Sequence, residues 1–221
     1  MNTRPSRGFA SRSNYLILIA ALAAGLGLFA AQHFFGLAGS LPSVRAEQLK
    51  SVRLINPPRE LPDYRLTLSD GSAATPATLR GHWTVVFLGF THCPDVCPTT
   101  LAELAKAQKI WQAVPENIRP RLLFVSVDPE RDTPAKTGEY ARYFHADTLA
   151  ASADPAALGN FAQALGLVYM KVPLGNGDYT MDHSATLVVL DPQGRQAGLI
   201  RPPLAWQDIA QDLRLLAESA P

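Results

Sequence analysis

The sequence is poor in cysteine, with only Cys93 and Cys97 among its 221 residues. A scaffold of several disulfides is therefore excluded, and so are an iron–sulfur cluster and a closed structural zinc site, which both need more ligands than two thiolates. Two cysteines four positions apart also close too small a loop to stabilise a domain of this size. The pair therefore predicts chemistry rather than structural support.

An excess of positive charge is also missing, since 20 Lys and Arg face 19 Asp and Glu. Arg4, Arg7 and Arg12 lie in the first thirteen residues, which contain no acid, so 17 basic and 19 acidic residues remain for the rest. No basic stripe is left to bind nucleic acid. The hydrophobic content of 47% excludes disorder for most of the chain and suffices for a core.

Residues 13–44 contain no Asp, Glu, Lys or Arg. Within them, the apolar run Tyr15–Phe35 would span about 30 Å as a helix, which is the thickness of a bilayer's hydrocarbon core. The preceding arginines should stay in the cytoplasm, so the rest of the chain should cross the membrane. A cleaved signal peptide is the alternative, with Ala38–Gly39–Ser40 as its best cleavage site, and it gives the same location.

The sequence thus predicts four parts. Residues 1–14 form a cytoplasmic N-terminus and residues 15–35 a single transmembrane anchor. Residues 36–58 contain Gly, Ser and several Pro and are expected to be a tether, and residues 59–221 form one folded domain.

Strands and helices alternate in the predicted domain. Strands are expected at 64–70, 83–90, 121–127, 167–172, 185–190 and 195–200, and helices from Pro98 onward and at 133–143, 154–165 and 206–217. This order predicts an α/β, thioredoxin-like sandwich with a mixed central sheet, in which the first two central strands are parallel and the last two antiparallel. The cysteines then lie at the carboxyl end of a central strand, where such sheets place their sites.

Cys93 and Cys97 are spaced so that their sulfurs can converge at the start of a helix. A helix N-terminus stabilises anions, so we expect the pKa of both thiols to be lowered. Thiolates are soft ligands that favour Cu(I), Zn(II) or iron–sulfur clusters. Two sulfurs need a third ligand, and histidine is the usual one.

The five histidines differ in their context. His33 ends the apolar run and suits a membrane interface, whereas His82 and His145 are expected to be solvated or capping residues. His92 adjoins Cys93 but should point away from it, which makes it the weaker candidate for a ligand or tuning group. His183 immediately precedes a predicted strand, where scaffolds present functional groups, although a structural role would also fit.

Three motifs together are more specific than any one of them. Phe90–Pro98 (FTHCPDVCP), Val127–Pro134 (VDPERDTP) and Tyr179–Ala185 (YTMDHSA), the last followed by Leu190–Gly194 (LDPQG), resemble the Sco (SenC) family of membrane-tethered, thioredoxin-like copper proteins. The resemblance covers roughly residues 60–217. It implies that Cys93, Cys97 and His183 bind copper, as Cu(I) or Cu(II), and that Asp182 and Asp128 support the site.

The same resemblance implies a biological role. The family helps to assemble the copper centre of cytochrome c oxidase, so the expected partner is the copper-bearing subunit of that enzyme, with other periplasmic copper chaperones or thiol reductants as further partners. The expected location is the cytoplasmic membrane, with the domain facing the periplasm. Such a protein delivers a metal and is not primarily an enzyme.

Several residues keep two interpretations. Asp95, between the cysteines, either adds negative charge to the site or bonds a backbone amide. The segment from Asp128 to Asp132 could equally be a turn closed by a surface ion pair. Met170 is expected to belong to the core rather than to bind copper.

Two alternative functions remain open. An extracytoplasmic thiol–disulfide oxidoreductase would use the same fold, although the usual redox spacing has two residues between the cysteines and not three. A zinc enzyme with an open coordination position also fits the ligand count. A peroxiredoxin fits poorly, because Phe90 stands where that class has a threonine.

Overall fold

The computed structural model describes residues 19, 21–23 and 48–219. The chain divides into a unit of residues 1–40 and a unit of residues 41–221, and the fold below is that of the second unit. Most of the predicted anchor, including His33, lies outside the described residues. In the part of the chain that is described, no helix combines the length and the apolar character needed to cross a membrane.

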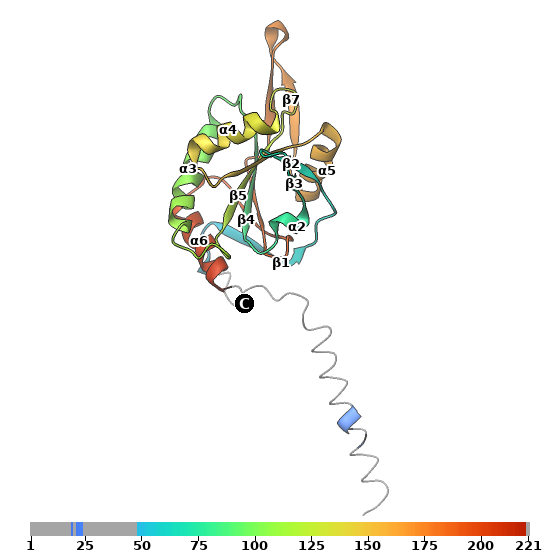
Figure 1. Ribbon diagram of the computed structural model, residues 1–221, viewed down its shortest axis with the longest axis vertical. Coiled ribbons are helices and arrows are strands. Elements are labelled where there is room, and N and C mark those ends of the chain that lie inside the picture. The colour runs from blue at the N-terminus through green and yellow to red at the C-terminus, as the bar shows by residue number, and fades with distance from the viewer. Residues whose placement is uncertain (1–18, 20, 24–47, 220–221) are drawn as a thin grey trace, which may run out of the picture. The chain divides into compact units, whose positions relative to one another are not determined.

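Strands and helices alternate through the second unit (Figure 1). The strands are β1 (Val52–Arg59), β2 (Leu66–Leu68), β3 (Ala73–Ala74), β4 (Thr84–Gly89), β5 (Arg121–Ser126), β6 (Leu149–Ser152), β7 (Tyr169–Pro173), β8 (Tyr179–His183), β9 (Leu187–Leu190) and β10 (Gln196–Ile200). The helices are α2 (Pro76–Leu79), α3 (Val96–Trp111), α4 (Pro134–Phe144), α5 (Pro155–Leu165), α6 (Trp206–Ser219) and the 3₁₀ turn η2 (Gly175–Gly177).

Eight strands form one mixed sheet in the order β1-β10-β9-β4-β5-β6-β2-β3. β4 pairs in parallel with β5, and β9 pairs antiparallel with β10, as the sequence predicts. Every residue of β4 is buried, because helices cover both faces of the sheet and a strand at its centre meets no solvent. The result is the predicted thioredoxin-like sandwich.

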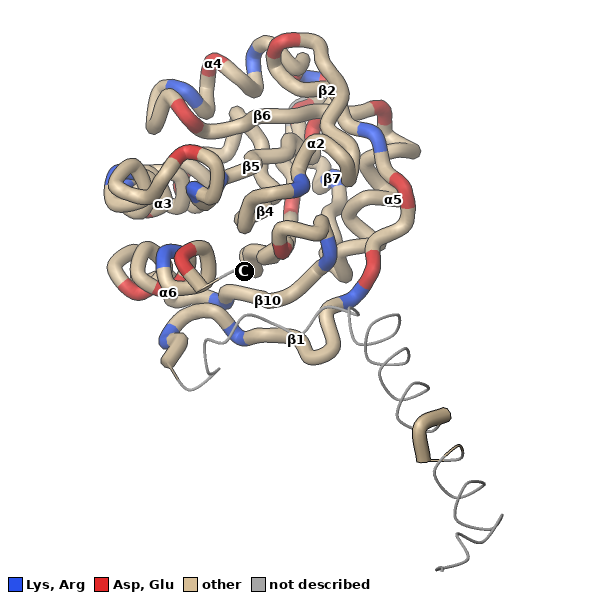
Figure 2. Tube along the Cα trace, turned by 60° about the horizontal axis from the view of Figure 1, so that its bottom comes forward, with Lys and Arg blue, Asp and Glu red and all other residues tan. Residues whose placement is uncertain are grey.

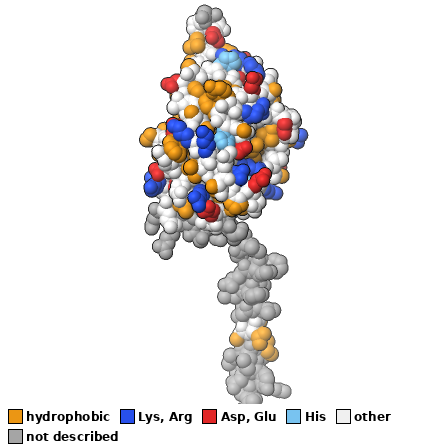
Figure 3. Space-filling view, turned by 60° about the vertical axis from the view of Figure 1, so that its left-hand side comes forward, with side chains coloured by type: hydrophobic (Ala, Val, Ile, Leu, Met, Phe, Trp, Pro, Cys, Tyr) orange, Lys and Arg blue, Asp and Glu red, His pale blue; other side chains and the backbone are white. Residues whose placement is uncertain are grey.

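Helices α3, α4 and α6 lie on one side of this sheet and α5 lies on the other (Figure 2). One face of α6 is an apolar stripe of buried side chains: Ile209, Ala210, Leu213, Leu216 and Ala217. The indole N–H of Trp111 on α3 donates to the carbonyl of Ala210 on α6, at 3.1 Å. On the face seen in Figure 3, Lys and Arg alternate with Asp and Glu between hydrophobic side chains, in keeping with the nearly neutral composition.

The predicted tether is too long. Residues 52–59 form β1, the edge strand that pairs with β10, and the side chains of Leu49 and Val52 are buried. Because residues 57 and 58 are both proline, the sequence pattern predicted a tether here and not a strand. A proline lacks the N–H that a central strand must donate, but an edge strand has one side without a partner and tolerates it.

The strand predicted at 167–172 does not join the central sheet. It becomes β7, which pairs antiparallel with β8 in a separate two-stranded ribbon that projects from the body of the domain (Figure 1). His183 is the last residue of β8 and lies opposite Tyr169. The position of His183 just before β9 had suggested a loop. The structure instead holds it in a β-ladder.

Candidate metal centre

Cys93, Cys97 and His183 come together at the carboxyl end of β4. Their Sγ and imidazole nitrogen atoms all lie within 4.8 Å of one another. Two sulfurs and one nitrogen form a soft ligand set, which suits Cu(I) and, by its ligand count, Zn(II). The chain thus brings to a single point its only two cysteines and the one histidine that the family resemblance adds to them.

The cysteine arm of this centre is the loop from Thr91 to Asp95 and the first turn of α3. The helix begins at Val96 and not at Pro98, so Cys97 already lies within its first turn. The backbone N–H of Cys97 donates to Sγ of Cys93, at 3.3 Å. One of the helix's free N–H groups therefore points at a sulfur and stabilises negative charge there.

Cys97 departs from the expectation of two thiols with lowered pKa values. Its side chain is fully buried, and this burial raises the pKa of the Cys97 thiol far above its usual range. The bond to the backbone of Phe90 lowers it, but by less. The sequence reveals the helix N-terminus, which lowers a thiol pKa, but not the burial of Cys97. In the folded domain the cost of burying a thiolate is the larger effect.

A glycine makes room for this buried sulfur. Gly89 ends β4, and a Cβ there would lie 2.7 Å from Cε2 of Phe124 and 3.0 Å from Sγ of Cys97. The first distance is shorter than real Cβ contacts, and the second is tighter than most of them. The backbone of β4 can therefore approach the first turn of α3 only because residue 89 has no side chain.

The histidine arm is β8. The carbonyl of Ser184 lies 3.1 Å from Nδ1 of His183 and can only accept, so Nδ1 carries the proton. Nε2 then offers its lone pair at 3.3 Å from Sγ of Cys97. The ring also packs edge-on against Phe87 and Phe90, and burial lowers the pKa of His183. A neutral imidazole with its proton fixed on the far nitrogen is the form that binds a metal.

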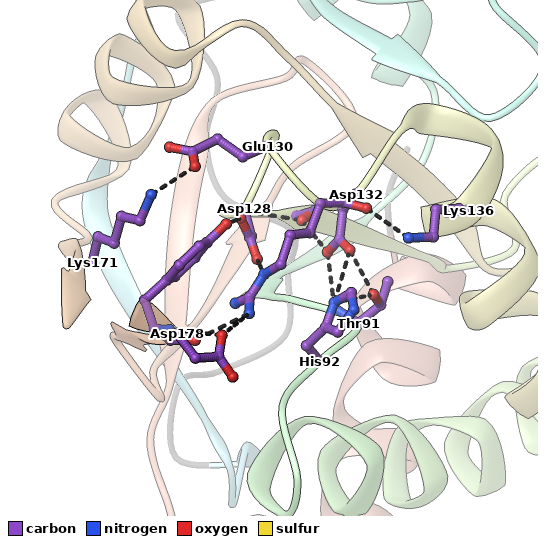
Figure 4. Close-up of polar contacts among 11 residues, drawn as sticks. Thr91, His92, Asp128, Glu130, Asp132, Lys136, Lys171 and Asp178 are labelled. Carbon is purple, nitrogen blue, oxygen red and sulfur yellow. Dashed lines mark hydrogen bonds and ion pairs between the residues drawn. The ribbon is translucent and has the colours of Figure 1, made fainter. Parts of the chain in front are cut away.

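Asp128 does not point at the metal-binding atoms. It is buried just beyond β5, next to the cysteine strand as predicted, and its Oδ1 accepts from the hydroxyl of Tyr179 at 2.8 Å. Its other oxygen pairs with Arg131 (Figure 4). Asp128 therefore fastens the β7–β8 ribbon to the loop after β5, and any support it gives to His183 acts through the backbone of β8.

Asp132 is a residue that the sequence offered only as part of a charged turn. It is completely buried and accepts from the N–H of Thr91 at 2.8 Å and from the hydroxyls of Thr91 and Ser126 (Figure 4). Thr91 is two residues before Cys93, so this carboxylate holds the cysteine arm. The sequence signal for Asp132 was its place in the motif Val127–Pro134, but that motif contains three acids and does not indicate which of them is buried.

The remaining predicted residues lie around the centre without joining it. Asp95 is the exposed N-cap residue of α3 and its side chain makes no capping bond. Asp182 is exposed beside His183, and His92 is exposed with its ring near Thr91 and Asp132. Glu130 forms an exposed ion pair with Lys171, in agreement with the interpretation as a surface pair.

Three expectations about other side chains have mixed outcomes. His145 caps α4, as proposed. His82 is buried and its Nδ1 contacts the carbonyl of Arg119 at 2.9 Å, so it is not solvated. Met170 is 60% exposed on the ribbon and does not belong to the core, because β7 leaves the sheet that would have covered it.

Comparison with known proteins gives consistent matches. A family model described as SCO1/SenC matches residues 53–218. Protein SCO1 homolog 1, mitochondrial, of Arabidopsis thaliana is 37% identical over 131 residues, which is 59% of this chain and only 39% of that longer protein.

Solved structures of similar chains have the same fold. Bradyrhizobium japonicum ScoI with copper bound is 35% identical, with a TM-score of 0.65 over 71% of this chain and 98% of that one. Apo Sco1 of Thermus thermophilus is 33% identical, with a TM-score of 0.64 over 81% and 99%. Because the family model covers most of the chain and these structures share its sheet and helices, the chain belongs to the SCO1/SenC family.

Proposed function

We propose that this protein binds a copper ion through Cys93, Cys97 and His183 and delivers it to the copper centre of cytochrome c oxidase. The observation that carries the proposal is the approach of Sγ of Cys97 to Nε2 of His183, at 3.3 Å, with Cys93 within 4.8 Å of both. These three donor atoms are already close enough together to bind one ion without a large movement of the chain. The copper is cargo in this account, not a permanent cofactor.

Copper fits this ligand set better than zinc does. Thiolates are soft ligands, and at a given site Cu(II) binds more tightly than Zn(II) in the Irving–Williams order. Copper bound to the similar Bradyrhizobium japonicum ScoI supports the same choice here. Two sulfurs and an imidazole therefore suit both Cu(I) and Cu(II).

Delivery requires that the ion can leave, and the centre has an accessible side. Cys97 is buried, whereas Cys93 is only half-buried, so a ligand from another protein can approach the ion next to Cys93. Three ligands also leave a coordination position open. The copper-bearing subunit of the oxidase is the proposed recipient, and other periplasmic copper chaperones or thiol reductants are proposed to load or reduce the centre.

Thiol–disulfide exchange is the weaker alternative. An exchanger attacks with one accessible thiolate, which Cys93 can supply, so the burial of Cys97 does not separate the two functions. The spacing does count against exchange, because three residues lie between the cysteines and the usual redox motif has two. His183 has no role in such an exchanger. We therefore assign the redox chemistry of the pair to loading and release of copper and not to turnover of disulfides.

The proposed location is the cytoplasmic membrane, with the domain in the periplasm. It rests on the arginines before the uncharged run Tyr15–Phe35. Protease added to intact spheroplasts should digest the chain after Pro42. Protection in intact spheroplasts and digestion only after lysis would reverse this orientation.

The test of the proposal compares ligand variants of the full chain purified in detergent. Cys93→Ser and Cys97→Ser should nearly abolish retention of Cu(I) measured by competition with a chelator. His183→Ala should weaken binding by at least about 10-fold, since even groups behind a ligand often contribute that much. The rate at which His183→Ala reduces a test disulfide should differ little from that of the wild type, because this reaction depends on the thiols. Met170→Ala is the control, because this soft side chain is 60% exposed on the ribbon and is not among the three ligands.

Equal copper affinity in the wild type and in His183→Ala would remove the third ligand from the proposal. Rapid turnover of disulfides by the wild type, unaffected by His183→Ala, would replace copper delivery by the reductase alternative.

A further inference from the structure

One segment touches both arms of the metal centre. Residues 126–132, from the last residue of β5 to the turn before α4, hold the loop before Cys93 through Asp132 and the His183-bearing ribbon through Asp128 (Figure 4). We infer that Asp132 and Asp128 are positioning residues that set where the thiols stand relative to the imidazole. This inference rests on the proposed function, because it assumes that all three groups bind one ion.

The cysteine arm is held by several bonds to one carboxylate. Oδ2 of Asp132 accepts from the N–H of Thr91 at 2.8 Å and from Oγ of Ser126 at 2.6 Å, and Oδ1 accepts from the hydroxyl of Thr91. Asp132 has no exposed surface, so water cannot replace these bonds. Thr91 is thereby fixed two residues before Cys93.

The histidine arm is clamped through Tyr179. Its hydroxyl donates to Oδ1 of Asp128 at 2.8 Å, while the guanidinium of Arg131 lies 3.8 Å from the centre of its ring and also pairs with Asp128. Lys171 lies 3.8 Å from the same ring. Two cations and one carboxylate thus hold a single tyrosine, which an ordinary surface contact would not require.

Tyr179 and His183 are four positions apart in β8, so their side chains project from the same face of the ribbon. Among the described residues, β7 and β8 pair in a sheet only with each other. The clamp therefore adds a fixed point between the ribbon and the loop after β5, and a change at Tyr179 is transmitted along β8 to the imidazole.

The two anchoring side chains have different targets. The backbone of Asp128 joins them, since its N–H donates to Oγ of Ser126 at 3.1 Å and its carbonyl accepts from the N–H of Asp132 at 2.9 Å, so only changes to side chains can separate the two anchors. Asp132 reaches the thiols through Thr91 and does not touch the ribbon in any described bond. Asp128 reaches His183 through Tyr179 and does not touch the cysteine loop in any described bond. Loss of the first anchor should disturb sulfur ligation whether or not the imidazole is present, whereas loss of the second should matter only while His183 is a ligand.

A double-mutant cycle on Cu(I) affinity tests this with the full chain in detergent. Tyr179→Phe removes the hydroxyl and keeps the ring. It should weaken Cu(I) binding about 10-fold in the wild-type background and leave it unchanged in the His183→Ala background. Asp128→Asn should behave in the same way. Thr91→Val should weaken binding by a similar factor in both backgrounds.

Matched controls separate positioning from a general loss of stability. Tyr143→Phe makes the same chemical change at a tyrosine that is 85% exposed, and Thr67→Val does so on an exposed position of β2. Both should leave the affinity unchanged. Electron paramagnetic resonance of the Cu(II) form gives a second measurement: Tyr179→Phe should move the spectrum toward that of His183→Ala, and Thr91→Val should not.

The outcomes distinguish the inference from the function beneath it. If Tyr179→Phe weakens copper binding equally with and without His183, or has no effect, the ribbon anchor does not act through the imidazole and the inference is wrong. Equal effects of Thr91→Val and Thr67→Val on copper affinity would likewise show that Asp132 does not position the thiols. Equal affinity of the wild type and His183→Ala would instead contradict the three-ligand site itself.

Discussion

Sγ of Cys97 and Nε2 of His183 lie 3.3 Å apart, although 86 positions separate the two residues in the chain. One belongs to the first turn of α3 and the other ends a ribbon outside the central sheet. The contact forms because β4 delivers the cysteine loop to the carboxyl edge of the sheet, next to the point where β8 leads into β9. Four consequences of this arrangement and of the fold around it can be measured.

The two thiols should differ in reactivity. Cys97 is fully buried with a raised pKa, whereas Cys93 is half-buried at the surface of the centre. Iodoacetamide at pH 7.5 should therefore modify Cys93 first in the reduced, metal-free protein, and Cys97 only after unfolding. Peptide mapping by mass spectrometry measures this order, with Cys93→Ser as the control for slow labelling of Cys97. Equal rates for both thiols would contradict the burial of Cys97.

Gly89→Ala should destabilise the domain and disturb the centre. The new methyl would lie 2.7 Å from Phe124 and 3.0 Å from Sγ of Cys97, and overpacking of this kind costs about 1–3 kcal/mol. Gly159→Ala, in the interior of α5, is the control. A Cβ at residue 159 would meet only the hydroxyl of Tyr169, at 3.9 Å, and alanine stabilises a helix interior by up to about 1 kcal/mol relative to glycine. Urea unfolding should thus give opposite signs for the two substitutions.

Asp212→Asn should loosen the start of the domain. This buried carboxylate on α6 accepts from the backbone N–H groups of Lys50, Ser51 and Val52, at 2.7–3.1 Å. An amide group turns a donor toward these donors, and we expect a loss of about 3 kcal/mol in unfolding free energy. Asp208→Asn, on the same helix, removes only an exposed ion pair with Lys50 and should cost under about 1 kcal/mol. Similar losses for both would contradict the buried role.

The metal-free protein should lose stability in mild acid. Burial lowers the pKa of His82, His145 and His183 below the value of 6.5 expected when the chain is unfolded. The unfolded chain therefore binds protons first, so the unfolding free energy should hold above pH 6.5 and fall as the pH drops below it. Urea unfolding at pH 7.5 and 5.5 measures the change, which His82→Gln should reduce. An unchanged difference in that variant would remove His82 from the explanation.

The sequence by itself determined the elements whose patterns are local. The buried run of β4, the stripe of α6 and the turn between β9 and β10 are each written in consecutive residues, so the parallel pair and the C-terminal hairpin could be predicted. The spacing of Cys93 and Cys97 predicted a soft metal site for the same reason. His183 joined them only through its resemblance to a family motif.

Tertiary structure decided what depends on partners distant in the chain. Pairing with β10 made an edge strand of residues 52–59 despite two prolines, and the departure of β7 from the central sheet left Met170 exposed on the ribbon. Burial reversed the expected pKa of Cys97. Likewise, Asp128 and Asp132 are two acids of one motif, and the sequence does not say what either carboxylate contacts. Only the fold turns one toward Tyr179 and the other toward Thr91, because which backbone and hydroxyl groups a buried carboxylate meets is set by the packing of segments that lie far apart in the chain.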